Sequence, residues 1–155
     1  MFTCPRCKLE AEAMPRACPR CALTLDPVEL ESWRRAFREQ VLDHLEMLGD
    51  FQRQLDYQRN VPIADVVAEL LCQWFDDLGF GDERRRGSHE FGTTFTETEW
   101  DVLDEFSTLF DDAIRRVEAR TWPSPELAAL QGHPEWSRLA AAANSVAARL
   151  RHGPP

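Results

Sequence analysis

Residues 2–27, FTCPRCKLEAEAMPRACPRCALTLDP, contain two identical CPRC tetrapeptides, at residues 4–7 and 18–21, with ten residues between them. In each tetrapeptide the two-residue gap allows a tight turn to direct both sulfurs toward one ion, and proline fixes φ inside the turn at about −65°. Two such half-sites together supply four thiolates, the complete ligand set of a structural zinc ion. The sequence therefore predicts one Zn²⁺ bound by Cys4, Cys7, Cys18 and Cys21.

Residues 1–26 contain too few large apolar side chains to fold without help. The sizeable ones are Phe2, Leu9, Met14, Leu23 and Leu25, which cannot offset the conformational entropy lost on ordering the segment. Structural zinc contributes about 10–16 kcal/mol in zinc-finger peptides, and this binding free energy appears as folding free energy. We therefore expect a structural ion whose four positions are all filled by cysteine, with none open for a substrate or an activated water.

Other uses of these cysteines compete with zinc. Disulfides need an oxidising compartment, but the chain begins MFTCPRC, without the apolar segment of a secretory signal. A thioredoxin-type redox pair uses one CxxC beside a βαβ pattern, which the sequence lacks. Iron remains an alternative, because tetrahedral sulfur coordination suits both metals. A cytoplasmic location and a zinc ion are the expectations that follow.

Residues 2–27 resemble the short zinc-ribbon modules found at the ends of many bacterial and archaeal proteins, whose usual pattern is CPxCG followed at a short distance by CxxCG. Lys8 and Ala22 stand where the family commonly has glycine, and those glycines often serve a turn with positive φ. The resemblance implies a metal-clipped β-turn or hairpin, with backbone strain or a different turn at these two positions. It covers about 26 of the 155 residues and says little about function.

The chain after residue 26 is predicted to be helical, beginning with a helix that runs from Pro27 to a glycine cap at Gly49. Asp26 supplies an N-cap, proline takes the first helical position, and Glu29 lies three residues after the cap. Because this helix starts directly after the cysteines, we expect a short, stiff junction. Apolar residues at three- and four-residue spacing predict its buried stripe: Leu30, Trp33, Phe37, Val41, Leu45 and Leu48.

Further helices follow, and strand patterns are missing outside the cysteine-rich segment. We expect a second helix from about Pro62 to Gly79, a third from the Thr96–Glu99 capping box to Pro123, a short helical turn after Pro125, and a last helix over residues 134–151. The predicted fold is mainly α. It consists of a four- or five-helix antiparallel bundle at residues 27–152, preceded by a zinc ribbon at residues 1–26.

The charge distribution disfavours a general nucleic-acid or membrane surface. The chain has 27 acidic and 18 basic side chains, for a net charge of −9. Residues 1–26 carry +1 before metal binding, so the remainder carries −10. No apolar run approaches the roughly 20 residues that a membrane span requires. The one local basic run, Arg84-Arg85-Arg86, lies in a glycine-rich loop and offers a contact for an anionic group.

No catalytic motif is recognised in the chain. GxSxG, GxxxxGK[ST], GxGxxG and HExxH patterns are absent, and no histidine follows a glutamate by three residues. His44 is interpreted as a residue at the boundary of the first apolar stripe rather than as a ligand. Cys72, outside the two pairs, is interpreted as a buried structural thiol.

Two short segments, Trp74-Phe75-Asp76-Asp77 and His133-Pro134-Glu135-Trp136, resemble parts of small bacterial helical proteins of unknown or immunity-type function. This resemblance implies an acidic, non-catalytic protein that binds another protein, and it assigns no functional residue.

The sequence thus favours a zinc-binding protein that is not an enzyme and whose helical part binds a protein partner, as an immunity-like or accessory factor. The first alternative is a nucleic-acid-associated regulator that uses the ribbon and the Arg84–Arg86 loop, which the net charge disfavours. The second is an enzyme whose site is assembled in the bundle from scattered carboxylates and His44.

Overall fold

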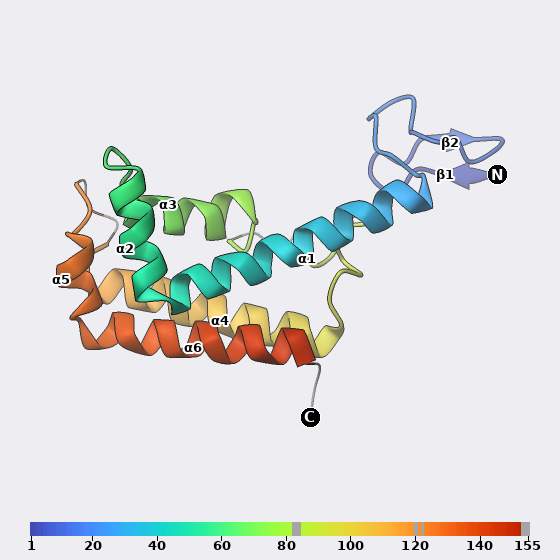
Figure 1. Ribbon diagram of the computed structural model, residues 1–155. Coiled ribbons are helices and arrows are strands. Elements are labelled where there is room, and N and C mark those ends of the chain that lie inside the picture. Colours follow the sequence, from blue (N-terminus) through green and yellow to red (C-terminus); the bar gives the residue numbers. More distant parts are fainter. Residues whose placement is uncertain (82–84, 120, 122, 153–155) are drawn as a thin grey trace.

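The computed structural model describes residues 1–81, 85–119, 121 and 123–152, and this part of the chain is mainly helical (Figure 1). Residues 1–26, called the cysteine module below, include an antiparallel hairpin of strands β1 (Phe2–Thr3) and β2 (Glu10–Ala11). The described residues also form six α-helices and a π-helical turn: α1 (Pro27–Gly49), α2 (Phe51–Asn60), α3 (Val66–Cys72), η1 (Gln73–Asp77), α4 (Glu97–Arg116), α5 (Leu127–Gln131) and α6 (Pro134–His152). The mainly α class and the hairpin are confirmed, whereas the predicted count of four or five helices is not.

Three long helices, α1, α4 and α6, form the body of the helical part. Helix α6 packs along both α1 and α4 and runs opposite to them, and α2 and α5 lie at the end away from the cysteine module (Figure 1). Buried apolar side chains form one large cluster in the bundle and a small one around the cysteines. Across the described residues, no helix combines the length and the apolar character needed to cross a membrane.

Helix α1 begins as predicted but ends for a different reason. The Asp26 carboxylate accepts hydrogen bonds from the backbone N–H groups of Val28 and Glu29, which confirms the N-cap. Gly49 is not in the left-handed region, and Asp50 is the C-cap, so the predicted glycine cap is wrong. A Cβ at position 49 would lie 2.1 Å from Oδ1 of Asn144 on α6, so glycine leaves room for the Asn144 amide, whose Nδ2 donates to the Gly49 carbonyl at 3.1 Å. The residue permits close approach of two helices.

Helix α2, which the apolar pattern does not predict, is held by a buried amide. The Gln54 side chain is fully buried, and its Nε2 donates to the carbonyl oxygens of Met47 and Leu48 at 2.9 and 3.0 Å. These carbonyls belong to the last turn of α1, where no further helical N–H is present to bond them. A polar helix therefore packs against the end of α1 by satisfying its unpaired acceptors.

The buried stripe of α1 differs from the prediction at two positions. Trp33 is 42% exposed, although Leu30 and Phe37 on either side of it in the stripe are buried. His44 is only 4% exposed, so its interpretation as a boundary residue is wrong. Its ring stacks on Trp74 with centroids 5.5 Å apart, and its Nδ1 lies 3.1 Å from Oε1 of Gln73. The other five predicted residues of the stripe are buried.

The segment after α2 becomes helical later than predicted. Asp65 caps α3 by accepting from the N–H of Ala68 at 2.9 Å, so the helix begins at Val66 rather than near Pro62. Cys72 is exposed, which contradicts its interpretation as a buried thiol. The buried face of this segment runs through Val67, Leu70, Leu71 and Trp74, and Cys72 lies off that face.

The last two long helices follow their local signals. Thr96 and Glu99 form the predicted capping box at the start of α4. The helix ends at Arg116 rather than at Pro123, and Glu118 adopts a left-handed φ of 54° just beyond its end. Helices α5 and α6 match the prediction, and α6 buries every residue of its expected stripe: Trp136, Leu139, Ala140, Ala143, Val146 and Leu150.

The burial of His44 predicts a loss of stability in acid. Burial lowers the pKa of His44 from 6.5 to about 4, although Gln73 and Asp43 favour the charged form. The unfolded chain takes up this proton near pH 6.5, so stability falls by about 3 kcal/mol as the pH drops from about 6.5 to about 4. Urea unfolding at pH 7 and pH 4.5, with chelator in both buffers, should show this loss. His44→Phe should remove that component and keep a ring beside Trp74.

The matched control for this prediction is His152→Asn, at the exposed end of α6. It should unfold with the pH dependence of the wild type. Equal acid sensitivity in His44→Phe and the wild type would contradict the assignment.

Candidate metal centre

The cysteine module is built from two turns with the same backbone hydrogen bonds. In the first cysteine turn (residues 4–9), the Cys4 N–H donates to the Leu9 carbonyl at 2.8 Å and the Lys8 N–H donates to the Cys4 carbonyl at 2.9 Å. The second cysteine turn (residues 18–23) repeats both bonds at the same lengths, from Cys18 to Leu23 and from Ala22 to Cys18. Antiparallel pairing flanks each turn, between β1 and β2 in one case and at a single bridge in the other. The repeated CPRC sequence thus folds into a repeated turn.

The two residues that replace the expected glycines adopt positive φ. Lys8 has φ of 60° and Ala22 has φ of 54°. For residues with a Cβ this left-handed conformation costs about 1–2 kcal/mol. Both turns therefore carry the backbone strain expected at these positions. The free energy gained on folding the module has to offset this strain.

The two turns bring the four predicted ligands together. Their sulfur atoms all lie within 4.8 Å of one another, and the four thiols are free rather than joined in disulfides. The separations between the turns are 3.7 Å from Cys4 to Cys21 and 3.5 Å from Cys7 to Cys18. Four sulfurs at 2.3 Å from a tetrahedral zinc ion would stand about 3.8 Å apart. The arrangement therefore fits a single tetrahedral metal ion.

The protonation of the sulfurs is uneven. The pKa of Cys7 is raised to about 11, because burial and its sulfur neighbours outweigh a hydrogen bond from the Leu9 N–H. Burial also opposes ionisation of Cys18, but N–H groups of Cys21 and Arg20 donate to its sulfur, and its pKa falls to about 6. The N–H of Cys7 likewise lowers the pKa of Cys4. Four adjacent thiolates repel one another, so the fully ionised set needs a cation.

The cysteine module is joined to α1 by polar contacts. Arg16 forms ion pairs with Asp26 at 3.3 Å and with Glu29 at 2.8 Å, and the Thr24 hydroxyl donates to the second Glu29 oxygen at 2.6 Å. The bond from Thr24, followed by that from Arg16, lowers the pKa of Glu29. Glu29 therefore ties the residues that flank the second cysteine turn, Arg16 and Thr24, to the first turn of α1. These contacts link the cysteine module to the helix that follows it directly, and the stiffness of the junction stays a prediction.

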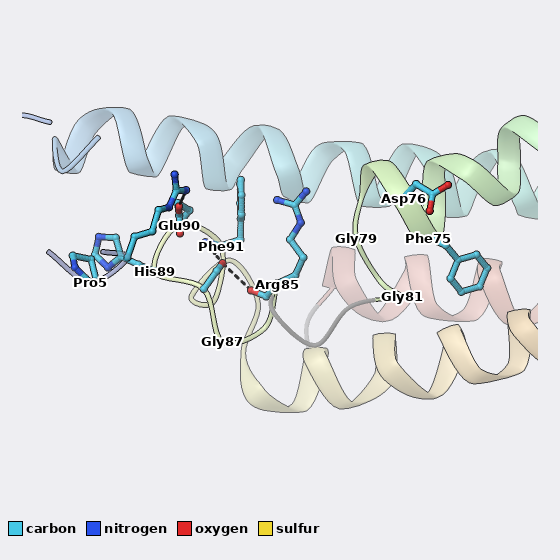
Figure 2. A pocket seen from close by; sticks show the side chains of 12 residues that line it. Pro5, Phe75, Asp76, Gly79, Gly81, Arg85, Gly87, His89, Glu90 and Phe91 are labelled. Carbon is cyan, nitrogen blue, oxygen red and sulfur yellow. Dashed lines mark hydrogen bonds and ion pairs between the residues drawn. The ribbon is translucent and has the colours of Figure 1, made fainter. Parts of the chain in front are cut away.

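A second connection, which the sequence pattern does not reveal, leads to the loop before α4. Arg6, from the first cysteine turn, forms an ion pair with Glu90, whose side chain is 8% exposed. Arg34 of α1 donates to the backbone carbonyls of His89 and Glu90, both at 2.9 Å. A cleft of about 960 Å³ adjoins these residues, with Pro5 toward one end and Phe75 toward the other (Figure 2). In the sequence, the charge of Arg6 within the first CPRC tetrapeptide was the signal that could have suggested its ion pair with Glu90.

The predicted basic run is largely engaged within the protein. Arg84 lies outside the described residues. Arg86 binds three carboxylates of α4 at 2.6–2.8 Å: those of Glu97, Asp101 and Asp104. The Arg85 guanidinium stands 4.8 Å over the ring of Phe91. Two of the three arginines are therefore committed to contacts within the chain.

Comparisons with known proteins do not add a relationship. The chain matches no family model, and searches of curated proteins and of solved structures return no match. The assignment of the site therefore rests on the four sulfurs and their surroundings.

Replacing one cysteine should remove the metal while leaving the helices folded. For Cys18→Ser we expect loss of the bound ion and unfolding of the cysteine module, because its own apolar cluster is small. The bundle has a separate aromatic and aliphatic core. Elemental analysis measures the metal, and circular dichroism measures the retained helix. Cys72→Ser, outside the cluster, is the control and should keep both; loss of helicity throughout Cys18→Ser would contradict the separation.

Glycine at a strained turn position should tighten metal binding. Ala22→Gly relieves about 1–2 kcal/mol of strain and loses about 0.4–1 kcal/mol to the greater freedom of the unfolded chain. The net gain of about 1 kcal/mol corresponds to roughly fivefold higher affinity in competition with a chelator. Ala13→Gly, at an exposed position outside the positive-φ set, should not increase the affinity. An unchanged or lower affinity in Ala22→Gly would contradict the role of strain.

Proposed function

We propose that this chain is a cytoplasmic, zinc-binding protein without catalytic activity, which binds another protein as an accessory or immunity-like factor. The observation that supports the metal is the convergence of four cysteine sulfurs at separations suited to one tetrahedral ion. Zinc is the preferred ion because it fills four-thiolate structural sites without redox chemistry. Cys4, Cys7, Cys18 and Cys21 would hold it, and it would supply folding free energy to the module.

The site supports a structural role for the ion. All four tetrahedral positions are accounted for by cysteine, so none is left for a substrate or a reactive water. The module is tied to α1 through Glu29 and to the loop before α4 through Glu90. An ion bound by both cysteine turns would hold the module against α1 and against the loop before α4. The fixed surface that results is suited to binding a partner.

Trp33 is the side chain that best supports a protein partner. It lies in the second turn of α1, the helix that follows the cysteine module directly, and it is 42% exposed. Tryptophan is on average highly buried in single chains and is enriched among the residues that dominate binding energy at interfaces. An exposed tryptophan beside the module therefore marks the surface where we expect the partner.

The two alternatives have less support. The nucleic-acid hypothesis relied on the basic run, but Arg86 is held by three carboxylates and Arg85 packs over an aromatic ring. The enzyme hypothesis relied on scattered carboxylates together with His44; Asp76 and Glu90 line the cleft, but His44 is buried and does not.

The surface around Trp33 can be tested by substitution. In affinity capture from the native host, the wild-type chain should retain a stoichiometric protein partner. Trp33→Ala should bind that purified partner at least tenfold more weakly in calorimetry, because truncating a central tryptophan costs about 2 kcal/mol or more. Ile63→Ala is the control, since Ile63 is 98% exposed and lies next to α3.

Three results would count against the proposal. Capture of no stoichiometric protein would remove the partner, and equal affinity of Trp33→Ala and Ile63→Ala would move the surface elsewhere. Binding of nucleic acid with an affinity that falls steeply as salt increases would favour the first alternative.

A further inference from the structure

The first cysteine turn controls the position of one charged side chain. Arg6 stands between two of the cysteines, Cys4 and Cys7, so the backbone that presents it is the backbone of the turn. Its guanidinium pairs with Glu90, a carboxylate that is 8% exposed. A buried carboxylate is tolerated when a cation accompanies it and becomes strongly destabilising when that cation is withdrawn. The burial of Glu90 therefore depends on the integrity of the turn.

Glu90 belongs to residues 85–92, called the docked segment here, which contacts α1 and is anchored at its start to α4 by the ion pairs of Arg86. Arg34 holds its carbonyls at positions 89 and 90. Phe91 packs on Phe37 of α1 with ring centroids 4.8 Å apart. The Gly92 carbonyl accepts from the indole N–H of Trp100 at 2.9 Å. The docked segment thus connects the metal centre to the aromatic core of the bundle.

We infer that metal occupancy of the four-cysteine centre controls the packing of the docked segment on α1, through the Arg6–Glu90 ion pair. This inference rests on the proposed metal binding. With the ion bound, the first cysteine turn holds Arg6 against Glu90 and the segment stays on α1. When the ion is removed, the turn lacks the apolar side chains to persist, Arg6 is released, and the uncompensated carboxylate of Glu90 leaves for water.

The coupling has a consequence for the surface beside the metal centre. Pro5 and Arg6 of the cysteine module and His89, Glu90 and Phe91 of the docked segment line the same cleft (Figure 2). Release of the segment therefore changes the shape of this cleft. By thermodynamic linkage, packing of the segment raises the affinity for the metal by the same factor by which metal binding favours the packing.

Hydrogen exchange at two amides that bond within the segment reports whether the segment keeps its folded structure. The Gly92 N–H donates to the Ser88 carbonyl at 2.8 Å and the Phe91 N–H donates to the Ser88 hydroxyl at 3.1 Å, so both amides are protected in the docked segment. In the full chain, replacing one equivalent of Zn²⁺ by a chelator should speed exchange of these amides about tenfold, within the range of typical couplings between sites.

Charge variants separate this coupling from simple unfolding. Arg6→Gln should give the zinc-bound protein the fast segment exchange of the chelated wild type. Glu90→Gln, which leaves no charge to bury, should make the exchange nearly independent of zinc and should lower zinc affinity by a similar factor. Combining the two changes should restore protection. Glu12→Gln, an exposed carboxylate of the cysteine module, is the control and should behave as the wild type.

The outcome that overturns the inference is specific. If chelation abolishes protection at residues 2–11 and leaves the docked segment unchanged, the metal site stands and the coupling is wrong. If the chain binds no zinc, both the coupling and the proposed metal function fail.

Discussion

The unbroken backbone hydrogen bonding of α1 is the constraint on which the rest of the structure depends. Its 23 residues form one rod of about 35 Å, and the two ends of this rod contact different parts of the protein. Asp26 and Glu29 at its start receive the cysteine module, while its second half packs against α6. The position of the module relative to the bundle is thus set by a helix rather than by a flexible linker.

One guanidinium fixes this rod to both of its long neighbours. Arg38 donates to both carboxylate oxygens of Glu99 at 2.6 and 3.2 Å and to the carbonyl of Leu150 near the end of α6 at 2.6 Å. Glu99 also accepts from the Thr96 N–H in the capping box of α4. Although burial opposes it, this set of donors lowers the pKa of Glu99. Charge-assisted, two-pronged contacts of this kind specify geometry as well as energy.

The cysteine module and the bundle differ in what stabilises them and in what they can bind. The module offers four sulfurs suited to a metal ion, and the bundle supplies a core that does not need one. The contacts that join the two are ionic, at Arg16 and at Arg6. Among these pairs, Arg6–Glu90 has a carboxylate that is 8% exposed, so withdrawal of Arg6 would leave a buried charge without its partner.

The sequence by itself determined the features that depend on neighbours along the chain: the pairing of cysteines within each CPRC turn, the N-caps at Asp26 and Thr96, and the apolar stripe of α6. Only the tertiary structure decided which helix faces are covered. Trp33 is exposed although Leu30 and Phe37 on either side of it are buried, and His44 is buried because η1 lies against it. Helix α2 and the Arg6–Glu90 pair stayed hidden because their partners are unpaired carbonyls and a distant carboxylate. Periodicity records how apolar residues repeat, whereas burial and ion pairing depend on what the fold places opposite them.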